Sequence, residues 1–300
     1  MNTLIIGGSG SLGIEIIKKF INHKLLITYN NNYVEGGIKY NAINMQLDDV
    51  VHNLNEIDVA IILLADKDPT SCYNNKKYSN QLNVESVKNI LTILKSHSIK
   101  PIFLSTDFIF SGKKGNYVET DKPNPILLYG YQKVKIENYI INNFEDYLIF
   151  RLSKTYDIEI TSPFKPYYNW VEMFEKERNI YCATDQIFNP IWVQDAAEII
   201  LQITLKELNG IFNLAGPKSF SRFEIFKLLY NEYQNFCNSD VKLIECSFDD
   251  LSNNPEKWPL NTSMIVDKSL KRINLKLLLL EDAVQETIKR YFKLKKEKIR

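Results

Sequence analysis

Tyr129 and Lys133 stand four residues apart, a spacing suited to acid–base chemistry. In a helix, side chains at this spacing lie one turn apart on the same face, where both can reach one substrate atom. A lysine cation beside a phenol favours the phenolate, so we expect the pKa of Tyr129 to be lowered towards neutrality. Tyr131 and Lys135, in the same segment, share this spacing. Because such pairs are common, the meaning of this one depends on what surrounds it.

Ser105 and Thr106 close a short apolar segment, residues 102–106, that precedes the tyrosine. Such a segment is typical of a buried strand. In doubly wound sheets, ligands bind at the carboxyl ends of parallel strands. We therefore predict that Thr106 holds the same substrate oxygen as Tyr129, and that Thr106, Tyr129 and Lys133 form the catalytic set.

A glycine-rich turn lies between the first apolar segment and the first helical pattern, with glycines at positions 7, 10 and 13. Residues without a Cβ let the backbone approach a pyrophosphate and let the helix pack on the strand. Free N–H groups at the start of the helix attract the phosphate charge. The turn predicts a dinucleotide site, and the alternative is a tight turn that only packs. The candidate contacts in the turn are Gly7, Gly10, Ser11, Leu12 and Gly13.

The end of the second predicted strand should select the cofactor. An acidic residue there would accept hydrogen bonds from the ribose hydroxyls and favour NAD, whereas an arginine would favour NADP. The sequence places Asn30, Asn31 and Asn32 at this point. Because no carboxylate repels a 2′-phosphate, we favour NADP(H) over NAD(H), with Asn30 as a contact. The alternative, that these asparagines only form a turn, stays open.

Strand and helix patterns alternate around these candidates. Apolar runs predict strands at residues 3–6, 25–29, 59–64, 102–106, 147–152 and 211–214, and helical periodicity predicts helices at 14–21, 83–94, 129–141, 195–205 and 221–230. Asp195 and Ser221 are the expected N-caps of the last two helices, and residues 162–168 are expected to form an irregular loop. Strands separated by helices imply right-handed parallel crossovers. We therefore expect an α/β fold with a Rossmann-type doubly wound parallel sheet.

Composition excludes several classes of protein. Of the 300 residues, 45% are hydrophobic and 24% are charged, with a net charge of +1, as in ordinary globular proteins. The balanced charge argues against a nucleic-acid partner, and no apolar stretch predicts a membrane span or a signal peptide. The four cysteines and three histidines are scattered, so we expect neither a metal site nor disulfides. The expected location is the cytoplasm.

On these motifs the chain resembles the extended short-chain dehydrogenase/reductases, and within them the dTDP-4-dehydrorhamnose reductase group of sugar-nucleotide reductases. The resemblance is carried by the glycine turn and by residues 104–112, 124–133, 185–190 and 259–263, so it spreads over nearly the whole chain. It implies NAD(P)H-dependent reduction of a nucleotide-linked 4-keto-6-deoxysugar, in the synthesis of a surface polysaccharide or glycan.

The resemblance also implies a division of the chain. Residues 1–155, with a returning segment at 185–215, would form a dinucleotide-binding domain. Residues 156–184 and 216–292 would form a smaller C-terminal α/β lid that binds the substrate, and 293–300 a basic tail. The expected partner is the nucleotide-sugar substrate. A homodimer is left open.

Residue roles follow from the same resemblance. Tyr129 would protonate the C4 oxygen of the sugar as hydride arrives from the nicotinamide. Lys133 would hold the nicotinamide ribose and tune Tyr129. Ala65 and Asn83 join Tyr129 and Lys133 among the residues expected at the cofactor.

Several positions depart from the pattern of the resembled proteins. Phe108 stands where the sister 4,6-dehydratases carry a glutamate, so dehydration is not expected. Trp258 replaces an arginine near the substrate phosphates, and Lys154 replaces Asn or Trp. The substrate-binding candidates are Asp107, Lys154, Gln186, Arg222 and Trp258. Gln194 stands where metal-binding members would carry an acid, so no metal is expected.

Two other functions remain open at this stage. An epimerase would keep NAD tightly bound and return the hydride to the same substrate. A non-catalytic regulatory subunit would keep the fold and bind a partner enzyme, as the methionine adenosyltransferase regulatory subunit, which resembles this family, illustrates. The intact set of Thr106, Tyr129 and Lys133 argues against the second of these.

Overall fold

The computed structural model describes residues 1–159, 166–273 and 275–299. It contains a seven-stranded sheet in the order β11-β6-β5-β4-β1-β2-β3, in which all neighbouring strands are parallel. The strands are β1 (Asn2–Ile6), β2 (Lys24–Tyr29), β3 (Ile38–Lys39), β4 (Val59–Ile62), β5 (Lys100–Thr106), β6 (Leu148–Leu152) and β11 (Gly210–Leu214). The strand order reverses at β1, which has β2 on one side and β4 on the other. The predicted doubly wound α/β fold is confirmed.

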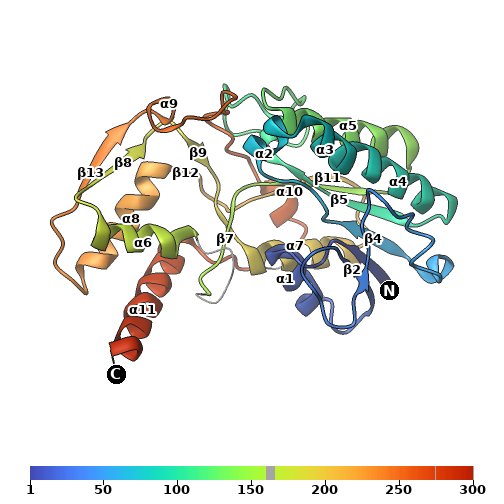
Figure 1. Cartoon of the computed structure of the whole chain (residues 1–300), viewed down its shortest axis with the longest axis horizontal. Coiled ribbons are helices and arrows are strands. Elements are labelled where there is room, and N and C mark those ends of the chain that lie inside the picture. Colours follow the sequence, from blue (N-terminus) through green and yellow to red (C-terminus); the bar gives the residue numbers. More distant parts are fainter. Residues whose placement is uncertain (160–165, 274, 300) are drawn as a thin grey trace.

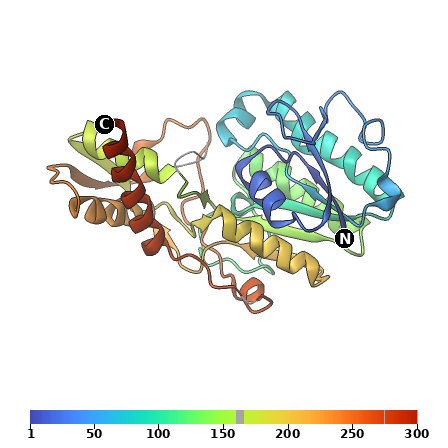
Figure 2. The same ribbon diagram turned by 90° about the horizontal axis from the view of Figure 1, so that it is seen from below.

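Helices cover both faces of the sheet (Figure 1). One face carries α2 (Pro69–Asn74), α3 (Lys76–Asn80), a π-helical turn (Gln81–Ser86), α4 (Val87–Ser96) and α5 (Leu128–Asn143). The other carries α1 (Ser11–Lys19) and α7 (Val193–Leu205), which Figure 2 shows from below. Alternate strand residues enter the two layers: Leu4 and Ile6 pack with α4 and α5, and Ile5 packs with α1 and α7. Burial on both faces explains why the strands read as continuous apolar runs.

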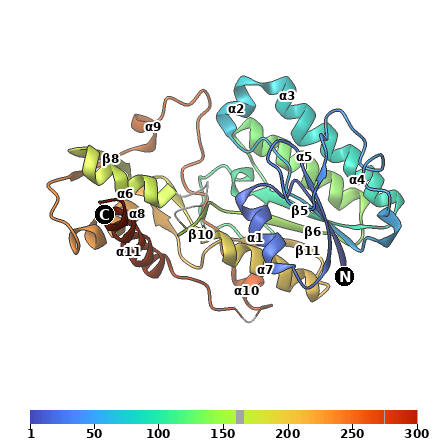
Figure 3. The same ribbon diagram turned by 60° about the horizontal axis from the view of Figure 1, so that its bottom comes forward.

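A second group of elements stands to one side of the sheet (Figures 1 and 3). It consists of α6 (Pro166–Lys176), β8 (Asn179–Ala183), α8 (Arg222–Gln234), β13 (Lys242–Cys246) and α11 (Leu280–Ile299). β8 and β13 pair in parallel, and the helices share an aromatic-rich core separate from the two layers of the sheet. Ser221 caps α8 through a capping box with Glu224, which confirms the expected N-cap.

Short strand pairs connect the two groups. β7 (Thr155–Tyr156) pairs with β10 (Ile191–Trp192), and β9 (Ile187–Phe188) pairs with β12 (Phe220–Ser221). The remaining elements are the 3-10 turns Leu54–Glu56 and Asp107–Ile109, and the short helices α9 (Phe248–Leu251) and α10 (Asp267–Leu270). The chain therefore passes between the groups several times, which brings late segments of the sequence to the carboxyl end of the sheet.

The expected N-cap of α7 is wrong. The helix begins at Val193, with Trp192 at the N-cap position. The Asp195 carboxylate instead accepts a hydrogen bond from the Leu278 N–H at 2.7 Å. The segment that leads into α11 supplies this donor, so a contact between distant segments decides the partner of Asp195.

Three other expected boundaries also change. Of the loop expected at 162–168, residues 166–168 belong to α6, and Pro166 suits its first turn because proline needs no N–H partner there. Residues 162–165 lie outside the described part of the chain. The helix expected at 83–94 extends over residues 76–96 through the π-helical turn. Residues 293–299 of the expected tail continue α11, and Lys295 pairs with Glu175 at 2.7 Å.

A buried ion pair ties α5 to β6. Arg151 Nη2 lies 2.9 Å from Glu137 Oε2, with side-chain exposures of 2% and 1%. Arg151 Nη1 also donates to the Glu119 carbonyl at 3.0 Å, and the guanidinium lies 5.4 Å from the centre of the Phe110 ring. Since α5 carries Tyr129, the pair holds the helix with the candidate acid against the sheet.

Candidate active site

The turn between β1 and α1 is closely packed around its glycines. Gly7 has a φ of +86°, and a Cβ there would lie 2.9 Å from the Leu64 nitrogen. A Cβ on Gly13 would lie 2.5 Å from the Gly8 carbonyl oxygen. Gly10 is the N-cap of α1 and offers no side chain to the first-turn N–H groups. The turn thus brings bare backbone and a helix N-terminus to one place, which suits a phosphate.

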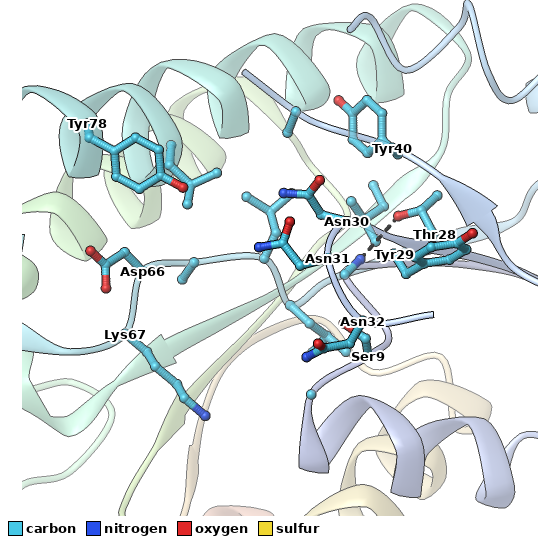
Figure 4. A pocket seen from close by; sticks show the side chains of 18 of the residues that line it. Ser9, Thr28, Tyr29, Asn30, Asn31, Asn32, Tyr40, Asp66, Lys67 and Tyr78 are labelled. Carbon is cyan, nitrogen blue, oxygen red and sulfur yellow. Dashed lines mark hydrogen bonds between the residues drawn. The ribbon is translucent and has the colours of Figure 1, made fainter. Parts of the chain in front are cut away.

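A cavity of about 490 Å³ opens at this turn, over the carboxyl ends of β1, β2 and β4. Figure 4 shows Asn30, Asn31 and Asn32 on one side of it, with Asp66 and Lys67 on the opposite side. Of the expected cofactor contacts, the lining includes Gly7, Gly10, Asn30 and Ala65. Ser11, Leu12 and Gly13 lie in the first turn of α1 and do not line the cavity.

Asn83 lies behind this cavity rather than in its wall. Its Oδ1 accepts from the Asp66 N–H at 2.8 Å, and its Nδ2 donates to the Asp66 carbonyl at 2.9 Å. The same Nδ2 donates to Gln132 Oε1 at 2.8 Å. Asn83 is 2% exposed, so it holds the segment after β4 in place. The expected contact between Asn83 and the cofactor stays a prediction.

Sequence analysis missed Lys67, Tyr40 and Tyr78, which all line the cavity. Lys67 also lines a second cavity of about 340 Å³, so the two cavities adjoin at this side chain. The signal for Lys67 was its place shortly after the apolar run 59–64, at the ligand-binding edge of the sheet. Tyr40 and Tyr78 carry no local signal, because tertiary packing brings their segments to the cavity.

Thr106 and Tyr129 both line the second cavity, as expected for a catalytic set. Thr106 is the last residue of β5, and Tyr129 lies in the first turn of α5. Lys133 follows one turn later but does not line the cavity. Its Nζ lies 5.7 Å from the centre of the Tyr129 ring and donates to the Leu104 carbonyl at 2.8 Å. The predicted helical spacing therefore places the lysine behind the tyrosine.

The expected lowering of the Tyr129 pKa is wrong for this arrangement. Burial raises the pKa of Tyr129 above its ordinary value, and the charges of Cys72, Asp107 and Asp66 add to the increase. Burial also lowers the pKa of Lys133 to about 8, against the opposing influence of Cys72 and Glu137. Tyr129 therefore carries its proton at neutral pH.

Asp107 lies next to Thr106 and is 5% exposed. Its Oδ1 accepts from the Thr106 hydroxyl at 3.2 Å, and its Oδ2 accepts from the Thr262 hydroxyl at 2.7 Å. Burial raises the pKa of Asp107 to about 6, although the two threonine hydroxyls and Lys154 oppose the shift. Thr262 comes from the late segment that the sequence singled out at 259–263, so this segment reaches the reaction centre.

Lys154, Gln186 and Trp258, three other expected substrate contacts, also line the second cavity. Trp258 packs edge-on against Phe108, with ring centres 5.3 Å apart. Arg222 is outside the lining. Its guanidinium lies 5.3 Å from the Trp170 ring centre, while its backbone N–H donates to the Gln186 carbonyl at 3.0 Å.

The segment before Trp258 crosses from the second group of elements to the sheet. Thr70 Oγ1 donates to Asn254 Oδ1 at 3.3 Å, and the Leu128 N–H donates to Glu256 Oε1 at 2.9 Å. Leu128 is the first residue of α5. The crossing segment therefore caps the helix that carries Tyr129 and forms one wall of the cavity.

Metal-binding clusters and membrane spans can be judged for residues 1–159, 166–273 and 275–299, which the structure describes. They contain no group of three His, Cys, Asp or Glu side chains that could hold a metal ion. None of their helices is both long and apolar enough to cross a bilayer.

Comparison with known proteins gives a family and several relatives. A family model described as RmlD substrate binding domain matches residues 1–293. Methionine adenosyltransferase 2 subunit beta of Xenopus laevis is 25% identical over 234 residues, covering 74% of this chain and 69% of that protein. Probable low-salt glycan biosynthesis reductase Agl14 of Haloferax volcanii is 25% identical over 227 residues, covering 73% and 76%. A crystal structure of a hypothetical dTDP-4-dehydrorhamnose reductase from Sulfolobus tokodaii is 27% identical with a TM-score of 0.80, covering 94% and 99%.

Proposed function

Because this chain belongs to the RmlD substrate binding domain family, we propose that it is an NADP(H)-dependent reductase of a nucleotide-linked 4-keto-6-deoxysugar. Hydride goes to C4, and the C4 oxygen takes its proton from Tyr129. The observation that carries the proposal is the adjacency of the two cavities, with Lys67 in both and with Thr106 and Tyr129 in the second. The similar structure from Sulfolobus tokodaii, described as a hypothetical dTDP-4-dehydrorhamnose reductase, supports the substrate class.

The residues of the first cavity fit a dinucleotide. Gly7 and Gly13 let the turn pack tightly, because a Cβ at either would collide with neighbouring backbone, while Gly10 has open space beside it for a pyrophosphate. The uncapped start of α1 faces the same place through Gly10. Asn30 and Ala65 complete the contacts. When bound, NADPH supplies the hydride, and the remaining tasks fall to side chains of this chain.

Tyr129 is suited to be the proton donor. Its raised pKa keeps the phenol protonated until the substrate oxygen becomes basic. The Lys133 ammonium, one helical turn away, would then stabilise the phenolate that remains. Thr106 would orient the same oxygen once its hydroxyl, which donates to Asp107 Oδ1 at 3.2 Å, turns to donate to the substrate. Donation, charge stabilisation and orientation are thus divided among three neighbouring residues.

The preference for NADP(H) rests on the end of β2. Asn30, Asn31 and Asn32 line the first cavity there, and no carboxylate joins them on that side (Figure 4). A 2′-phosphate would therefore meet neutral amide groups rather than a repelling charge. The NADP(H) preference is part of the proposal.

The second group of elements would serve as the substrate-binding domain, with the boundaries expected from the sequence. This group contributes three side chains to the wall of the second cavity: Gln186 just before β9, Phe188 in β9 and Trp258 in the crossing segment. The relative described as a probable glycan biosynthesis reductase supports a role in glycan synthesis. A cytoplasmic location completes the proposal.

The test is an assay of purified protein with NADPH and a panel of nucleotide-linked 4-keto-6-deoxysugars, followed by loss of absorbance at the nicotinamide band. We expect stoichiometric oxidation of NADPH with at least one sugar. Oxidation of NADPH by none of them would overturn the proposal. Tightly bound NAD that co-purifies with an inactive protein would favour an epimerase instead.

A regulatory subunit is the second candidate, because several relatives at 23–25% identity are methionine adenosyltransferase 2 beta subunits. Such a subunit needs the fold and a partner enzyme but no proton donor. Substitution of Tyr129 would leave its function unchanged, whereas a reductase would lose turnover. Co-purification of the wild-type chain with an adenosyltransferase, without reductase activity, would support this candidate.

A further inference from the structure

Lys154 is a cation without an anionic partner. It lies two residues beyond β6, lines the second cavity and keeps an exposed surface towards it. Among the described residues its ammonium forms neither an ion pair nor a hydrogen bond, and Nζ lies 5.2 Å from the centre of the Phe188 ring. The nearby Asp107 accepts from two threonine hydroxyls and forms no ion pair with Lys154 in the described part of the chain.

Polar atoms without partners gather in the same cavity. Ser105 Oγ, Ser153 Oγ and Gln186 Oε1 are buried and have no hydrogen-bond partner among the described residues. All three residues line the cavity that Lys154 lines, and Gln186 is 6% exposed. A buried polar group without a partner is costly, so the arrangement suits a polar ligand that supplies the missing bonds.

Arg222 does not neutralise or replace this lysine. It carries the same sign of charge, packs on Trp170 and lies outside the lining of the cavity. Enclosure by the cavity walls, followed by the Arg222 charge, lowers the pKa of Lys154 to about 8, while Asp107 opposes the shift. An anion beside Nζ would relieve both effects and hold the ammonium in its charged form.

We propose that Lys154 binds an anionic group of the substrate next to the reacting sugar, either a phosphate oxygen or a carboxylate on the sugar. The inference rests on the proposed function only for the expectation that the ligand is a nucleotide sugar. It adds that one negative group of that ligand lies in the same cavity as Thr106 and Tyr129. Lys154 is then a specificity-determining residue that touches the substrate.

The experiment is isothermal titration calorimetry of the full chain with UDP-glucose, UDP-glucuronate and dTDP-rhamnose. The variants are Lys154→Met, which removes the charge, and Lys154→Arg, which retains it. Lys257→Met is the matched control, because Lys257 is 70% exposed, pairs with Asp249 at 3.1 Å and does not line the cavity. Thermal unfolding of each variant verifies that the fold is retained.

We expect Lys154→Met to weaken binding by about 10-fold or more, because a charge-assisted contact is lost. The affinity of Lys154→Arg should lie within a few-fold of the wild-type value, and the affinity of Lys257→Met should equal the wild-type value. An equal loss for UDP-glucose and UDP-glucuronate identifies the anion as a phosphate. A loss confined to UDP-glucuronate identifies it as a carboxylate on the sugar, and since a 6-deoxysugar has no carboxylate at C6, this outcome would also replace the substrate class of the proposed function.

Equal affinities of wild type and Lys154→Met for every ligand would overturn the proposal, as would an equal loss in Lys257→Met. The proposal would also be overturned if the wild-type protein bound none of the three ligands. Because the titration needs no turnover, failure of the reductase assay would leave this result standing. Conversely, a reductase whose binding ignores Lys154 would refute this inference alone.

Discussion

Arg151 and Lys154 lie three residues apart at the end of β6, yet the structure surrounds their charges differently. The Arg151 guanidinium is buried against Glu137 and a backbone carbonyl. Lys154 faces a cavity and has no anionic partner among the described residues. A buried charge that is fully paired within the chain holds secondary structure together, whereas an unpaired one beside a cavity indicates a place for a ligand.

Two carboxylates show the same contrast. Glu137 binds Arg151 through both oxygens, at 3.4 and 2.9 Å. Asp107 is also buried but meets only threonine hydroxyls, and its pKa is raised to about 6. We therefore expect changes at the paired charges to affect stability and changes in the cavity to affect function.

The largest effect is expected from Glu137→Gln. It leaves the Arg151 guanidinium buried without an anion, which should lower the free energy of unfolding by about 3–5 kcal/mol. Urea unfolding at neutral pH measures the change. The double variant with Glu137→Leu and Arg151→Met removes both charges and should recover most of the loss. A double variant as unstable as the single one would contradict the assignment of the cost to the unpaired charge.

Tyr129→Phe should lower kcat by about 100-fold or more while leaving the unfolding temperature nearly unchanged. The phenol oxygen is the proposed proton donor, but the aromatic packing of the ring is retained. Steady-state oxidation of NADPH measures the effect. Tyr131→Phe, in the same helix and with a side chain 52% exposed, is the matched control and should keep full activity. Retained turnover in Tyr129→Phe would refute the donor role.

Asp107→Asn should change the free energy of unfolding in a way that depends on pH. Because the pKa of Asp107 is raised in the folded state, from 3.8 to about 6, folding favours the protonated form. The stability contributed by this group is complete below pH 3.8 and is lost as the pH rises through 6. The amide cannot ionise, so the variant should be more stable than wild type by about 1–3 kcal/mol at pH 8 and not at pH 4.

Urea unfolding at pH 4 and pH 8 tests this prediction. Asp121→Asn is a control of opposite sign, because the hydrogen bond from Lys114 lowers the pKa of Asp121 and the ionised form favours folding. A gain for Asp107→Asn that is the same at both pH values would show that ionisation is not the cause.

The smallest effect is expected from Asn30→Asp in the first cavity. A carboxylate at the end of β2 would repel a 2′-phosphate and should raise the KM for NADPH by about 10-fold. NADH, which lacks that phosphate, is the internal control and should be used as well or better. An equal change in the KM for NADPH and for NADH would show that the 2′-phosphate does not lie beside Asn30.

The sequence determined the features that depend on neighbours along the chain. The glycine turn, the helix that places Lys133 one turn after Tyr129, and the alternating strands and helices all follow from local spacing. The capping box at Ser221 was readable for the same reason. Such features need only the geometry of a helix or strand, which nearby residues impose.

Tertiary structure alone decided the contacts between distant segments. Thr262 bonds Asp107 across 155 residues, and Asp195 bonds the Leu278 backbone rather than its own helix. Asn83 holds the Asp66 segment, and burial reverses the shift expected for the Tyr129 pKa. Burial and long-range pairing depend on how the whole chain packs. Spacing along the sequence does not indicate which distant group will contact a given side chain.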